Sequence, residues 1–144
     1  MPMTTGTKYS RYILTEQGAS RSTPDAAVKP VVLQGASDWC GIRHRLKWKF
    51  LLKPGVVMDT PHTHDFDEFL VFLSANPADE LDFPAEIELL LGAEGEPNII
   101  SEPSVICLPQ GLVHGPLTVK NLGKPVLFCI IYLSPDYHRR PAGR

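Results

Sequence analysis

The sequence of 144 residues lacks any long apolar run. A membrane-spanning helix needs about 20 consecutive apolar residues, and no stretch approaches that length. The N-terminus, Met1 to Ser10, is polar and has no apolar centre of the kind that a signal peptide requires. We therefore expect a cytoplasmic protein without a membrane partner.

Cysteine and clustered positive charge are also scarce. Cys40, Cys107 and Cys129 are odd in number and widely spaced, which favours neither a disulfide framework nor a paired zinc-ribbon pattern. The formal net charge is -2, and the 14 lysines and arginines form only short clusters. This distribution gives no reason to expect a nucleic-acid partner.

Amphipathic stretches long enough for a typical helix are hard to find, whereas 14 prolines and 11 glycines interrupt the chain every few residues. This pattern predicts short strands joined by turns. The candidate strands cover residues 46–50, 56–64, 68–73, 85–91, 99–101, 104–108 and 126–133. Their number indicates an all-β fold, a single small antiparallel barrel or sandwich.

The length of the chain fits one domain. We expect the barrel to span residues 31–136. Residues 1–30 are less regular and form an N-terminal arm, in which residues 9–14 are a possible edge strand. Residues 137–144 form a frayed tail, because they contain few apolar side chains. The arm and the apolar outer surface of the sheets would suit a homodimer.

Four side chains are candidate metal ligands. His62 and His64 are two residues apart on a predicted strand, so their imidazoles project from the same face. Glu68 follows a short turn, and an antiparallel return would bring its carboxylate beside them. His114 lies in a Pro-Gln-Gly-Leu-Val-His loop, in which proline and glycine favour a tight turn. This set suits one divalent ion of iron, manganese, cobalt, nickel or zinc.

These residues resemble the two signature motifs of the cupin superfamily. The first motif is similar to Gly55 followed by His62-Thr-His64 and Glu68, and the second to Pro109-Gln-Gly111 followed by His114. The resemblance extends over roughly residues 46–133. It implies a double-stranded β-helix, or jelly roll, with His62, His64, Glu68 and His114 as the metal ligands.

Further side chains are candidates for the pocket. On residues 46–50, Leu46, Trp48 and Phe50 alternate with lysines, and we expect Trp48 and Phe50 to face the interior together with His44. Gln110 is a further pocket candidate, and His44 and Tyr132 are candidate catalytic groups. The cationic stripe of Arg43, Arg45, Lys47 and Lys49 would then face solvent or an interface. The reverse assignment would place it in the pocket and imply an anionic substrate.

The function that follows is that of a metal-dependent enzyme acting on a small, oxygen-rich organic molecule. An open metal position would support lyase, decarboxylase, isomerase or dioxygenase chemistry. The alternative is a module that binds a small ligand without turnover, because no clear acid or base stands out beyond the metal ligands. The fold alone does not select between these functions.

Overall fold

The computed structural model describes residues 7–13, 15, 31–35, 43–134 and 140–142. A short 3₁₀ helix, η1, covers Ser10–Tyr12, and the remaining elements are strands. These are β1 (Val31–Gly35), β2 (His44–Leu51), β3 (Gly55–Met58), β4 (His62–Thr63), β5 (Glu68–Ser74), β6 (Ala85–Leu91), β7 (Glu96–Ile100), β8 (Ser104–Leu108), β9 (His114–Leu122), β10 (Val126–Tyr132) and β11 (Arg140–Pro141). No helix within these ranges has the length and apolar character needed to cross a membrane.

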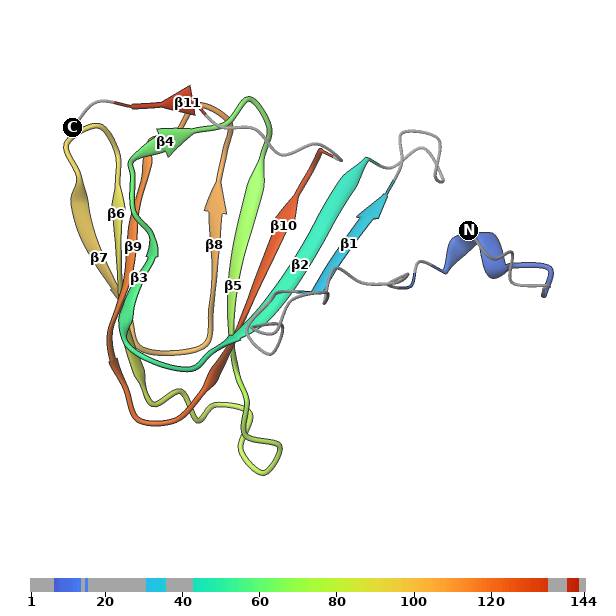
Figure 1. Ribbon diagram of the computed structural model, residues 1–144, viewed down its shortest axis with the longest axis horizontal. Coiled ribbons are helices and arrows are strands. Elements are labelled where there is room, and N and C mark those ends of the chain that lie inside the picture. Colours follow the sequence, from blue (N-terminus) through green and yellow to red (C-terminus); the bar gives the residue numbers. More distant parts are fainter. Residues whose placement is uncertain (1–6, 14, 16–30, 36–42, 135–139, 143–144) are drawn as a thin grey trace, which may run out of the picture.

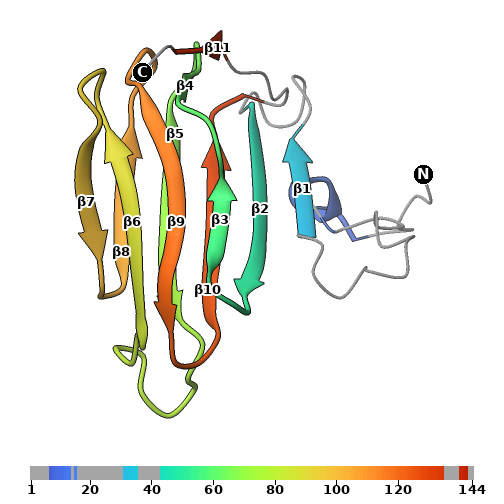
Figure 2. The same ribbon diagram turned by 60° about the vertical axis from the view of Figure 1, so that its left-hand side comes forward.

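The strands form two antiparallel sheets that face each other (Figures 1 and 2). One sheet has the order β1-β2-β10-β5-β8. The other has the order β11-β4-β9-β6-β7, and β3 also pairs with β9. The all-β antiparallel prediction is confirmed, although the sheets pack as two layers and do not close into a barrel.

The core lies between the two sheets. Along β5, β6 and β10 the buried residues fall at every second position, and Ser74, Leu91 and Ile130 at such positions are partly buried. This is the period that a strand with one inward face requires. Phe72 is fully buried, and its ring stacks on that of Phe128 at a centroid distance of 4.8 Å. The ring of Phe83 meets Phe72 edge-on at 6.4 Å. These aromatic contacts hold together the end of the sandwich away from the histidines.

The sequence predicts most strands but not all of them. Residues 85–91 and 104–108 are strands with the predicted bounds. The expected single strand over residues 56–64 is divided into β3 and β4, because Asp59 to Pro61 leave the sheet. β1 and β9 were not predicted. β9 contains Gly115 and Pro116, which favour a loop when read in isolation.

The ends of the chain differ from expectation where they are described. Residues 10–12 form η1 and not the possible edge strand over residues 9–14, whose last residue lies outside the described part. In the predicted frayed tail, Arg140–Pro141 pair with β4, and the Ala142 N–H donates to the Pro61 carbonyl at 3.1 Å. The rest of the predicted arm and tail (residues 1–6, 16–30, 137–139 and 143–144), and Cys40, also lie outside the described residues.

Candidate metal centre

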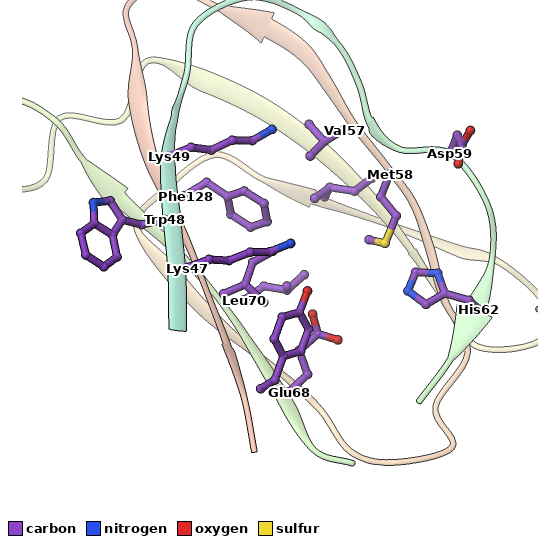
Figure 3. A pocket seen from close by; sticks show the side chains of 13 residues that line it. Lys47, Trp48, Lys49, Val57, Met58, Asp59, His62, Glu68, Leu70 and Phe128 are labelled. Atoms are coloured by element: carbon purple, nitrogen blue, oxygen red, sulfur yellow. The ribbon is translucent and has the colours of Figure 1, made fainter. Parts of the chain in front are cut away.

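Four buried polar side chains meet between the sheets at one end of the sandwich. His62 begins β4, His114 begins β9, and these two residues are paired in one sheet. Glu68 begins β5 in the facing sheet, and His64 lies on the segment that crosses between the sheets. His62 is only 1% exposed, and the other three are also buried. Figure 3 shows His62 and Glu68 projecting into the same cavity from different strands.

The distances among these groups are those of a cluster that shares one centre. One nitrogen from each of His62, His64 and His114 lies within 4.8 Å of the other two. The Glu68 Oε1 atom is 3.2 Å from His64 Nε2 and 3.5 Å from His114 Nε2. Burying a carboxylate and three imidazoles is costly without a compensating interaction. A cation at their common centre would compensate it.

Hydrogen bonds to the backbone fix two of the imidazoles. His62 Nδ1 lies 2.9 Å from the Thr60 carbonyl, and His114 Nδ1 lies 2.9 Å from the Leu112 carbonyl. A carbonyl oxygen only accepts, so each Nδ1 must carry the hydrogen and donate it. In the neutral ring the lone pair is then on Nε2, the nitrogen available to a metal. The donor set therefore fits a divalent first-row ion.

The origin of Glu68 differs from the prediction. We expected β4 and β5 to form one hairpin, with Glu68 returning beside His62 and His64. These strands instead belong to different sheets. The short segment that contains His64 crosses the space between the sheets, so Glu68 faces the histidines from the opposite layer.

The loop that carries His114 is tied to the crossing segment. The Gly111 N–H donates to the His64 carbonyl at 2.9 Å, and the Gln110 N–H donates to Asp67 Oδ1 at 3.0 Å. Gln110 was predicted as a pocket residue, but it is exposed and is not among the residues that line the cavity. Its backbone N–H is the group that helps to position the loop.

Gly115, directly after His114, allows close approach of β9 to Thr60 in the segment between β3 and β4. Its φ is +99°, and a Cβ at this position would lie 2.8 Å from the Thr60 carbonyl oxygen, the atom that holds His62 Nδ1. We expect Gly115→Ala to lower the free energy of unfolding by about 2 kcal/mol through strain and crowding. Displacement of the Thr60 carbonyl should also weaken metal affinity roughly 10-fold. Urea unfolding and metal titration measure the two effects.

Gly111→Ala is the matched control for this variant. Gly111 also has a positive φ, +85°, but a Cβ there would have no atom within 4 Å. Backbone strain alone should then cost about 1 kcal/mol and leave metal affinity unchanged. Equal metal affinities for the two variants would contradict a role for the Gly115–Thr60 contact in the centre.

A cavity of about 230 Å³ adjoins the cluster between the two sheets. It is bordered by β2 of one sheet and by β3 of the other, which do not pair with each other. Its lining combines charged, aromatic and aliphatic residues: Lys47, Trp48, Lys49, Val57, Met58, Asp59, His62, Glu68, Leu70, Leu117, Phe128, Ile130 and Tyr132.

Trp48 is among the residues that line the cavity, as predicted, but the side chains of β2 point the other way from the prediction. Lys47 and Lys49 project into the cavity, whereas the indole of Trp48 points away from it (Figure 3). Lys49 pairs with Phe128 and Lys47 with Ile130, and directly paired residues share a face of the sheet. Phe50 is 53% exposed and borders a separate surface groove. The alternation of aromatic residues and lysines defines the two faces of β2, but it does not determine which face is inward.

The two candidate catalytic residues occupy different places. His44 has the parity of Trp48 and is not among the residues that line the cavity. Tyr132 lines the cavity, is 2% exposed, and pairs with Glu68 across β10 and β5. Its ring lies 6.1 Å from that of His64. Tyr132 is therefore the one of the two that borders the candidate centre.

Lys47 lines the cavity, as only the reverse assignment of the faces of β2 predicts, and its surroundings are unusual for an ammonium group. Its Nζ lies 5.5 Å from the centre of the Tyr132 ring. Burial lowers the pKa of Lys47 below its ordinary value, and repulsion from Arg45 adds to this effect, while the Glu68 carboxylate opposes it. The pKa of Lys47 thus reflects both its burial at the cavity and its attraction to the Glu68 carboxylate.

Comparison with solved structures identifies the fold class. The chain has a double-stranded β-helix fold, as its resemblance to the cupin motifs predicts. No protein-family model matches the chain, and no curated protein matches it either.

Three structures illustrate the likeness. The polyketide cyclase RemF from Streptomyces resistomycificus is 16% identical, with a TM-score of 0.52 over 80% of this chain and 72% of that one. An oxalate oxidase is 12% identical, with a TM-score of 0.56 over 97% and 67% of the two chains. An uncharacterized double-stranded β-helix protein from Klebsiella pneumoniae subsp. pneumoniae is 12% identical, with a TM-score of 0.52 over 81% and 85%. At such identities the likeness establishes the fold and assigns no activity.

Proposed function

We propose that the protein is a metal-dependent enzyme that acts on a small, oxygen-rich organic molecule bound in the cavity beside the cluster. The observation that carries the proposal is the convergence of three imidazoles and one carboxylate at a buried point that adjoins this cavity. His62, His64, His114 and Glu68 would hold one divalent ion of iron, manganese, cobalt, nickel or zinc.

The cavity supports a catalytic role for such a centre. Four protein donors leave coordination positions open in six-coordinate geometry, and the cavity lies where an incoming molecule would reach them. A bound divalent ion supplies Lewis-acid chemistry and, for iron or manganese, redox chemistry. The apolar side chains of Leu70, Leu117 and Phe128 limit water in the cavity, and the Tyr132 phenol borders it as a hydrogen-bonding group.

Metal content is the direct test. We expect untagged protein, purified without added metal and then reconstituted, to retain about one divalent ion per chain after extensive dialysis, because the four donors form one site. Elemental analysis measures the ratio. The metal-loaded protein is then assayed for isomerase, lyase, decarboxylase and dioxygenase activity on small oxygenated acids, ketones and sugars.

The outcomes separate the alternatives. A ratio near zero after reconstitution with each of the five metals would contradict the proposal. A full metal complement without turnover of any compound that binds would instead favour the binding-module alternative.

A further inference from the structure

The side chains of β2 are arranged against the usual distribution of polarity. The strand turns Lys47 and Lys49 into the space between the sheets, while Trp48 and the 53% exposed Phe50 lie on the opposite face. The opposite orientation would bury two aromatic rings and expose two lysines. A strand is expected to bury its apolar face, and departures from that rule concentrate at functional sites.

The charges around the cavity are positive in excess once a divalent ion is bound. The lining contains two ammonium groups, from Lys47 and Lys49, and two carboxylates, from Asp59 and Glu68. A metal bound by Glu68 would add two further positive charges. Asp59 is exposed, so its carboxylate is largely solvated. An anionic ligand would offset the remaining positive charge.

The chemistry and spacing of the two lysines suit a carboxylate. They are two residues apart on one strand, so both project from the same face. Hydrogen bonds between an ammonium group and a carboxylate are charge-assisted and gain strength in a partly desolvated site. The cavity of about 230 Å³ is below the range of about 300–1,000 Å³ typical of ligand pockets, which favours a small compound.

We propose that Lys47 and Lys49 recognise a carboxylate of the substrate, so that the site takes a small organic acid held between these ammonium groups and the metal centre. This inference rests on the proposed function, because the metal centre is the second point of attachment. Lys47 and Lys49 are then the residues that select anionic over neutral compounds.

The test uses the full chain loaded with cobalt(II), whose absorption spectrum reports the metal centre independently of turnover. Malonate, succinate and glutarate are titrated calorimetrically, each beside its neutral diamide. We expect at least one dicarboxylate to bind, and its diamide to bind far more weakly. The double variant Lys47→Met, Lys49→Met should lose affinity for the dicarboxylate roughly 10- to 100-fold while its cobalt spectrum and metal content stay unchanged.

Lys53→Met is the matched control, because Lys53 is exposed in the turn after β2 and does not line the cavity. It should bind the dicarboxylate like the wild type. Three results would each overturn the inference and leave the metal centre standing: unchanged affinity in the double variant, equal affinity for the dicarboxylate that binds and its diamide, or no dicarboxylate binding to metal-loaded wild type. Wild-type protein that binds no metal would overturn the proposed function and this inference with it.

Discussion

His114→Ala is expected to lose the metal. The substitution removes one of three imidazoles whose nitrogens lie within 4.8 Å of one another, and it leaves the Glu68 carboxylate without its neighbour at 3.5 Å. Metal affinity should fall roughly 100-fold or more, and the retained ion from about one per chain to less than about a tenth of that. His62→Ala should have the same effect. Elemental analysis after dialysis measures it.

The same variants have a second readout that does not depend on turnover. At a metal concentration 100 times the Kd, bound metal should stabilise the wild-type fold by about 2.7 kcal/mol, and His114→Ala should gain almost nothing at that concentration. His44→Ala is the control, because His44 lies on the face of β2 that carries Trp48. Full metal retention in the double variant His62→Ala, His114→Ala would rule out this centre.

Phe72→Ala should be among the most destabilising single substitutions in the sandwich. Phe72 is fully buried, stacks on Phe128 and meets Phe83 edge-on. Its truncation removes apolar contacts and leaves a cavity between two sheets that cannot fully collapse, which should cost about 3–5 kcal/mol. The midpoint of urea unfolding measures the loss.

Leu73→Ala is the control for the packing argument. Leu73 is the next residue on β5, lies on the opposite face and is 40% exposed, so its truncation should cost less than about 1 kcal/mol. Similar losses for the two variants would show that the space between the sheets is not the dominant source of stability.

The candidate centre was largely predictable from the sequence because its ligands are tied to local patterns. Two histidines spaced by one residue must share a face of a strand, and a histidine after Pro-Gln-Gly follows a tight turn. The route of Glu68 was not predictable in the same way. Whether a strand returns beside its predecessor or crosses to the facing sheet depends on long-range pairing, here of β5 with β8 and β10.

The orientation of the two faces of β2 shows a second limit of prediction from the sequence. The alternation of Lys47, Trp48 and Lys49 defines two faces, and hydrophobicity assigns the tryptophan to the interior. The register with β10 places the lysines on the inward face instead, since Lys49 lies opposite the buried Phe128. A rule based on burial alone fails where the interior contains a cavity that is lined partly by charged groups. β9 was not predicted, because a glycine near the start of a segment favours a loop when the segment is read in isolation. The glycine is needed for the close approach of Gly115 to Thr60, a long-range contact that the sequence does not reveal.

The origin of the ligands in both layers of the sandwich makes the centre a bridge between them. His62 and His114 belong to one sheet and Glu68 to the other, so the complete donor set exists only after the two sheets have docked. A metal bound there would link the two sheets through its ligands. The free energy of metal binding would therefore stabilise the packing of the two sheets. A partly folded chain, in which the sheets have not docked, would not gain this stabilisation.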